Sequence, residues 1–108
     1  PMSQKTFAIA HKKGVPIAFG TDAGVFPHGT NAQEFAYMVE AGMPAAEAMQ
    51  SATKTNAALL GLSEELGKIK AGFLADLIAV PANPLQDITV LKNVGFVMKD
   101  GVIYKHKF

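Results

Sequence analysis

Residues 15–19, Val-Pro-Ile-Ala-Phe, form a short, unbroken apolar run with a helix-like segment on either side. A strand that is apolar on both faces is typical of a parallel sheet covered by helices. Residues 3–13 have helical spacing and stop at Gly14, and another helix begins near Asn31. This order of elements predicts an α/β fold in which residues 15–19 are a central parallel strand.

Two further helices are predicted between residues 31 and 61. Asn31 and Glu34 have the spacing of a capping box. Pro44 follows a glycine and a methionine and suits the first turn of a second, continuous helix, because the N–H that proline lacks has no partner there. Gly61 follows the last apolar position and is typical of a helix C-terminus.

Beyond residue 62 the pattern becomes β-like, and the expected strands are residues 66–70, 75–80, 94–99 and 102–106. The last two flank Asp100-Gly101, and Asp-Gly between two β-prone runs is the strongest short signal for a hairpin. We therefore expect a helical part over residues 1–62 and a mainly β part over residues 63–108. In the assembled protein we expect the following apolar side chains to be buried: Phe7, Ile17, Phe19, Phe35, Leu59, Ile69, Leu77, Ile78 and Val97.

Composition excludes several classes of function. The chain has no cysteine, which removes disulfides, thiolate metal sites and cysteine nucleophiles. Its net charge is +1 and its basic residues are scattered, so we expect no nucleic-acid partner. No apolar run reaches the roughly 18 residues of a membrane span, and the first residues lack the apolar stretch of a signal peptide. A cytoplasmic location without a membrane partner is therefore favoured.

Asp22 is the candidate for chemistry, because it follows the apolar run by three residues. Binding and catalytic sites form at the carboxyl ends of parallel strands. A carboxylate there can bind a metal, accept a proton from water, or cap the loop in an Asx-turn. Spacing alone favours the loop cap.

Four segments, in this order, resemble the amidohydrolase superfamily, in particular its imidazolonepropionase-like and Xaa-Pro dipeptidase (prolidase-like) members. Residues 14–24, GVPIAFGTDAG, resemble the eighth barrel strand and its loop, and residues 48–62, AMQSATKTNAALLGL, resemble the helix after the barrel. Residues 66–80 resemble the signature G-x-I-x-x-G-x-x-A-D-L, and residues 97–104, VMKDGVIY, resemble the C-terminal strand pair. The signature is carried by Gly67, Ile69, Gly72, Ala75, Asp76 and Leu77.

The resemblance implies that the chain is the C-terminal portion of a (β/α)8 TIM-barrel hydrolase. Residues 1–62 would supply the last barrel strand with its flanking helices, and residues 63–108 the C-terminal part of a small β-sandwich. The implied reaction is hydrolysis of a C–N bond of a small substrate, possibly an Xaa-Pro dipeptide, with one or two divalent metal ions, commonly zinc.

The resemblance also assigns roles to single residues. Asp22 matches the aspartate that contacts the metal and accepts a proton from the attacking water. His28 lies where related dipeptidases have a substrate-facing histidine, although a plain surface position in the loop is the alternative. Asp76 matches a structural position, where a carboxylate satisfies backbone donors near a glycine turn.

The family pattern also requires an H-x-H motif and further ligands that this sequence lacks, since its histidines are His11, His28 and His106. A (β/α)8 barrel takes about 250 residues. We therefore expect the 108-residue chain alone to be inactive and to bind zinc weakly or not at all. We expect it to associate with the missing barrel portion or to form a homo-oligomer. The alternative is a non-catalytic assembly module, because an unpaired apolar strand favours association.

Overall fold

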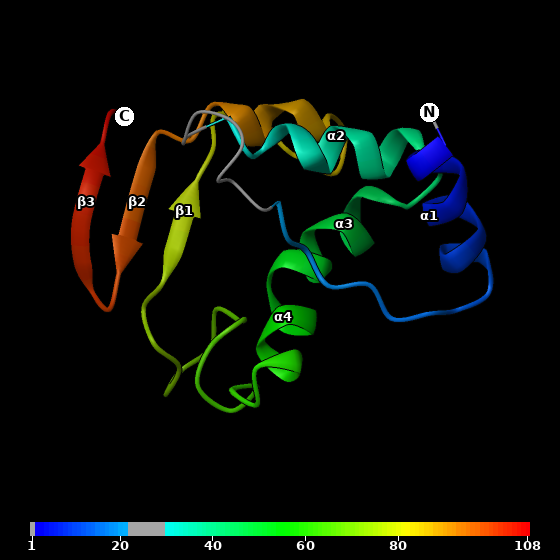
Figure 1. The fold of residues 1–108 in the computed structure, drawn as a ribbon. Coiled ribbons are helices and arrows are strands. Elements are labelled where there is room, and N and C mark those ends of the chain that lie inside the picture. The colour runs from blue at the N-terminus through cyan, green and yellow to red at the C-terminus, as the bar shows by residue number, and fades with distance from the viewer. Residues whose placement is uncertain (1, 22–29) are drawn as a thin grey trace.

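The computed structural model describes residues 2–21 and 30–108. The elements are α1 (Met2–Lys12), α2 (Gln33–Glu40), α3 (Ala45–Ala52), α4 (Lys54–Leu59), β1 (Leu77–Ala79), the 3₁₀ helix η1 (Ile88–Lys92), β2 (Phe96–Lys99) and β3 (Val102–His106). Figure 1 shows the sheet at one end of the molecule and α1 at the other. No helix in these ranges has the length and apolar character needed to cross a membrane.

Helices α1, α2 and α4 end in the same way, at a glycine with positive φ: Gly14, Gly42 and Gly61. At the end of α4, the N–H of Gly61 donates to Ala58 O at 3.1 Å and the N–H of Leu62 donates to Ala57 O at 2.8 Å. This pair of bonds is the Schellman motif, which satisfies carbonyls at the end of a helix. The predicted helix ends at Gly14 and Gly61 are therefore confirmed.

The predicted helix starts are less accurate. Helix α2 has Ala32 at its N-cap and no side-chain capping bond, so the capping box of Asn31 and Glu34 is wrong. Pro44 is the N-cap of α3 and precedes its first turn.

The second predicted helix is not continuous, because it breaks at Thr53, where φ is −119° and ψ is −96°. The Thr53 hydroxyl donates to Met49 O at 2.9 Å. A threonine hydroxyl that bonds back to the carbonyl four residues earlier competes with helix geometry and bends the chain. Helices α3 and α4 are therefore two short elements.

The core of the helical part consists of Met38, Met43 and Ala48, which are 5%, 4% and 0% exposed. Residues from α1, from the segment 15–21 and from α2 pack against it: Phe7, Ile17, Phe19, Phe35 and Val39. The apolar run predicted from the sequence therefore contributes to the core.

The same run does not form the predicted parallel strand, because residues 15–21 are not part of any sheet in this structure. The described strands all belong to one antiparallel sheet of order β1-β2-β3. A parallel strand needs a neighbouring strand for its backbone groups, and none of the described strands lies beside this run. The chain is α/β as expected, whereas its place in a barrel is a separate proposal.

The predicted hairpin is confirmed, with Lys99 opposite Val102 across the turn. Asp100 and Gly101 have φ values of 48° and 78°. Positive φ at both central residues is typical of the type I′ turn that favours two-residue hairpins. A bulge between Val97 and Met98 shifts the register against β3.

The predicted strand at residues 66–70 is wrong, since these residues form turns and irregular backbone. Its central side chain, Ile69, is 90% exposed, and Leu59 and Ile78, both expected to be buried after assembly, are 72% and 52% exposed in this chain. The sequence analysis did not anticipate η1, whose Ile88 and Leu91 are buried and which packs against α2.

Candidate functional site

Asp22 and His28, the two predicted site residues, lie outside the described residues. The structure does describe Ile17–Thr21, the segment that leads directly to Asp22. The contacts of this segment therefore show how the rest of the chain supports the candidate site.

The backbone of Phe19 is held by two different helices. Its N–H donates to Ser51 O at 3.0 Å and to Asn56 Oδ1 at 3.1 Å. Its carbonyl accepts from Asn56 Nδ2 at 3.0 Å. Residues from α3 and α4 thus bind the backbone groups that a neighbouring strand would bind in a sheet.

The side chain of Phe19 is fixed by a third helix. Its ring stacks on Phe35 of α2, with centroids 4.4 Å apart and planes 23° apart. Both rings pack against the core around Met38 and Met43. An aromatic pair of this kind adds about 0.5–1.5 kcal/mol beyond the area it buries, so the segment is anchored through both its backbone and its side chain.

The break at Thr53 frees the Ser51 carbonyl to accept the N–H of Phe19. The last carbonyls of a helix have no partner within it. Here Met49 O accepts from the Thr53 hydroxyl, Gln50 O accepts from Thr53 N, and Ser51 O accepts from Phe19 N. The end of α3 is satisfied by three separate donors, and one of them comes from the segment that leads to Asp22.

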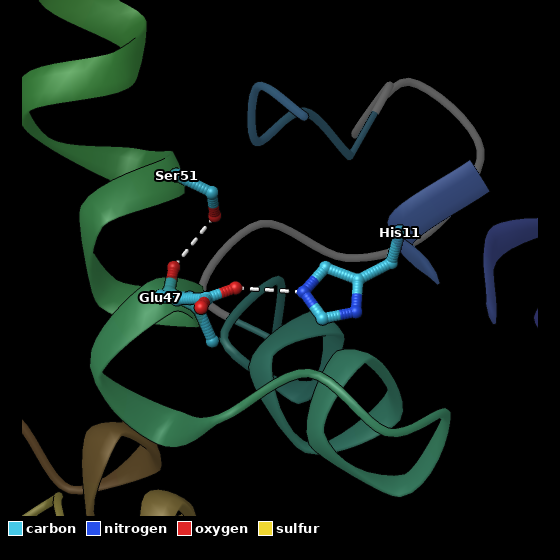
Figure 2. Close-up of polar contacts among 4 residues, drawn as sticks. His11, Glu47 and Ser51 are labelled. Atoms are coloured by element: carbon cyan, nitrogen blue, oxygen red, sulfur yellow. Dashed lines mark hydrogen bonds and ion pairs between the residues drawn. The ribbon is translucent and has the colours of Figure 1, made fainter. Parts of the chain in front are cut away.

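Ser51 is only 2% exposed, but it does not have the environment of a nucleophile. Its hydroxyl donates to Ala48 O at 2.6 Å within α3 (Figure 2). The hydroxyl proton is therefore used inside the helix, and the carbonyl of the same residue holds Phe19. We conclude that Ser51 supports the segment by its backbone.

The sequence analysis gave His11 no role, but its side chain joins two helices. His11 Nε2 lies 2.6 Å from Glu47 Oε2, which links α1 to α3 (Figure 2). The pair borders a cavity of about 660 Å³ that Val15, Ile17 and Met43 also line. The two residues are 36 positions apart, so no local pattern could have predicted the contact.

Asp76 has the structural role that the sequence analysis expected. Its Oδ1 accepts the N–H of Asp100 at 2.7 Å. The neighbouring Ala75 carbonyl accepts the N–H of Gly101 at 3.0 Å. The two residues before β1 therefore hold the turn of the β2–β3 hairpin.

The described residues do not fit a catalytic metal. In the ranges 2–21 and 30–108, no three histidine, aspartate or glutamate side chains come close enough to hold an ion. A catalytic zinc takes about three protein ligands and keeps one position for water. No catalytic step through a metal can be derived from these residues.

Comparison with known proteins identifies the family. The model of the Amidohydrolase family matches residues 4–104. Ochratoxinase from Aspergillus niger is 40% identical over 106 residues, which cover 94% of this chain and 22% of that protein. The crystal structure of that enzyme superposes with a TM-score of 0.78 at 38% identity, covering 95% of this chain and 25% of that chain.

Two dipeptidase structures are also similar. A Xaa-Pro dipeptidase with methionine bound in its active site superposes with a TM-score of 0.92 at 60% identity, over 94% of this chain and 25% of that one. A putative prolidase from Bifidobacterium longum gives 0.85 at 34% identity, over 94% and 26%. The chain thus spans about a quarter of the length of the proteins it matches. The chain belongs to the amidohydrolase family.

Proposed function

We propose that this chain is the C-terminal part of a hydrolase that cleaves the C–N bond of an Xaa-Pro dipeptide. The observation that carries the proposal is the 60% identity and TM-score of 0.92 to a Xaa-Pro dipeptidase. The likeness extends over 94% of this chain. Phe19, Ser51 and Asn56 lie in two of the segments, residues 14–24 and 48–62, that carry the family resemblance in the sequence.

In this proposal, residues 1–62 supply the last strand and flanking helices of a (β/α)8 barrel, and residues 63–108 supply part of a β-sandwich. Large apolar side chains that are open in this chain support it: Leu59, Ile69 and Ile78. Burying exposed apolar side chains of this size against further chain would be favourable. The remaining three quarters of the parent enzyme would cover these side chains.

Asp22 is the proposed proton acceptor. A positioned carboxylate can take a proton from the attacking water and pass one to the leaving amine. His28 is proposed to contact the substrate from the same loop. Asp22 follows Phe19 by three residues. Backbone hydrogen bonds and ring stacking fix Phe19, so the segment that leads to Asp22 begins from a fixed position.

Amidohydrolases generally depend on a metal. We propose a divalent ion, zinc, with Asp22 among its ligands and the remaining ligands outside this chain. When bound in such a site, a zinc ion supplies an activated water at neutral pH. On this proposal the 108-residue chain alone is inactive, and a cytoplasmic location stays a prediction.

A second candidate is a non-catalytic module that assembles with itself or with a partner chain. The observation that favours it is the segment 15–21, which is apolar and has no strand beside it among the described residues. The neighbouring coding sequence separates the two candidates, because an H-x-H motif upstream would favour the hydrolase. Without such a motif, size-exclusion chromatography of the purified 108-residue chain shows whether it assembles into a defined oligomer.

The proposed function is tested with Asp22→Asn in the full-length enzyme that carries this segment. With Met-Pro as the probe substrate, kcat should fall by roughly 10²–10⁴, the range expected when a positioned proton acceptor is lost. Asp100→Asn is the matched control, because asparagine tolerates the positive φ of 48° at that exposed turn. Near-normal turnover by the Asp22 variant would show that Asp22 only caps its loop.

A further inference from the structure

The Asn56 side chain makes an unusual pair of contacts with the segment before the candidate site. Its Oδ1 accepts the N–H of Phe19 at 3.1 Å, and its Nδ2 donates to the carbonyl of the same residue at 3.0 Å. In an antiparallel sheet, two opposite residues exchange both of their backbone bonds in this way. A single amide side chain here takes the place of a neighbouring strand.

Only an amide side chain has the right groups for this contact, because asparagine carries an acceptor and a donor side by side on one plane. Aspartate at this position could still accept from Phe19 N, but it would direct a carboxylate oxygen at the Phe19 carbonyl. Alanine would remove both contacts. The Phe19 N–H would then keep its bond to Ser51 O, whereas the carbonyl would lose the Asn56 donor.

The backbone that carries Asn56 is itself well held. The next residue, Ala57, is 1% exposed, and a Cβ built on Gly67 would lie 2.9 Å from its Cβ. The chain after α4 therefore packs closely on the helix. Helix α4 also ends in the Schellman motif at Gly61. A side chain on such an element can fix the position of its partner.

We infer that Asn56 is a positioning residue, which acts on the proposed catalytic carboxylate through the backbone of Phe19. The inference rests on the proposed function, because Asp22 is the group being positioned. Asp22 follows Phe19 by three residues, so at most about 11 Å of extended chain separates them. A misplacement of about 1 Å at a catalytic group can cost about 10²-fold in rate, so the anchor at Phe19 bears directly on kcat.

The first test measures kcat and KM separately for Asn56→Ala and Asn56→Asp in the full-length enzyme with Met-Pro. We expect kcat to fall by about 10- to 100-fold in both variants, with KM changed by less than about threefold. The alanine variant introduces no charge, and the aspartate variant preserves the shape of the side chain. Asn93→Asp, the same chemical change at an exposed position after η1, should keep normal turnover.

A merely structural role predicts a different result. If Asn56 only stabilised the fold, its variants would unfold at lower temperature but would retain kcat when assayed well below their Tm. Thermal unfolding of each variant fixes that assay temperature. Normal kcat in the Asn56 variants, alongside an inactive Asp22→Asn, would overturn the inference and leave the proposed function intact.

The second test is a double-mutant cycle with Asp22→Asn. If Asn56 acts through Asp22, the variant that carries both Asp22→Asn and Asn56→Ala should be no slower than Asp22→Asn alone. If the double variant instead shows the product of the two single-variant losses in kcat, Asn56 acts independently of Asp22, and the inference is overturned. An active Asp22→Asn enzyme would instead refute the proposed function, and the inference with it.

Discussion

The helical part of the chain and its sheet are stabilised in different ways. In the helical part, Met43 and Ala48 are almost fully buried, and side chains from α1, α2 and the segment 15–21 pack around them. In the sheet, none of the residues of β1, β2 and β3 is fully buried. The sheet depends on backbone pairing and on the Asp100-Gly101 turn.

This difference indicates where substitutions should matter. Removing side-chain volume should destabilise the helical part, because a cavity forms where atoms were packed. In the sheet, changes of backbone conformation should matter more than changes of side-chain volume, as long as its faces stay open. If the rest of the full-length enzyme covers a face of the sheet, side-chain volume should matter there as well. The comparison can therefore be tested by making the same substitution in this chain and in the full-length enzyme.

The largest expected effect comes from Met43→Ala, set against Ile78→Ala. Met43 is 4% exposed, so its truncation should cost about 2–4 kcal/mol. Ile78 is 52% exposed in this chain and should cost less than about 1 kcal/mol here, but about 2–4 kcal/mol in the full-length enzyme if the sheet is covered. Urea unfolding of the 108-residue chain and of the full-length enzyme measures these losses in the free energy of unfolding. A small Ile78 loss in both would mean that the sheet face is open in the whole enzyme.

An intermediate effect should separate two glycines of similar conformation. Gly67 has a φ of 98°, and an added Cβ would lie 2.9 Å from Ala57 Cβ and 3.1 Å from Lys54 Cα. Gly101 has a φ of 78° and open space around it. Gly67→Ala should cost about 3 kcal/mol, from strain plus overpacking, and Gly101→Ala about 1 kcal/mol from strain alone. Equal losses of stability in thermal unfolding would show that the close packing of Gly67 on α4 adds nothing to the cost of the substitution.

The smallest effect concerns the acid side of the stability profile. Hydrogen bonds from the Thr89 hydroxyl and N–H lower the pKa of Asp87, and Lys92 lowers it further against an opposing desolvation effect. A pKa that is lower in the folded state stabilises the protein above the ordinary aspartate value, and this contribution is lost as pH falls through the folded-state value. Asp87 is exposed, so the effect should be small.

Thr89→Ala should raise the pKa of Asp87 and lower the Tm at pH 7, with the difference from the unmodified protein shrinking below about pH 4. Thr89→Ser keeps a hydroxyl and is the matched control. Melting curves from pH 3 to pH 7 provide the measurement. A Tm difference that stays constant over this range would mean that the hydrogen bonds do not act through the charge of Asp87.

The sequence predicted best the features whose cause is local. Gly14, Gly61 and the Asp100-Gly101 turn were identified correctly, because each depends on the conformation of one or two residues. The continuous helix through Thr53 was wrong, since the carbonyls freed by the break are satisfied partly by Phe19, far away in the sequence. The strand at residues 15–19 does not form in this chain for a related reason, because a parallel strand needs a partner that no described segment supplies.

The candidate site was predictable only in part. Asp22 and His28 came from the family resemblance, and the structure does not describe them. Asn56 lies in a segment that carried the resemblance, but its contact with Phe19 joins residues 37 positions apart. Neither helical spacing nor composition indicates such a partner, so the role of Asn56 required the three-dimensional structure.

The bond between Asp76 and the Asp100 N–H also has a consequence for the order of folding. It joins residues 24 positions apart and so closes a loop in the chain. That loop contains η1, whose buried Ile88 and Leu91 belong to the element that packs on α2. Closing a loop of this length costs entropy once, and it restricts the conformations that η1 can adopt before it docks on α2. Formation of the sheet should therefore lower the entropy that η1 still loses when it docks on α2, so that the sheet and the helical part fold cooperatively.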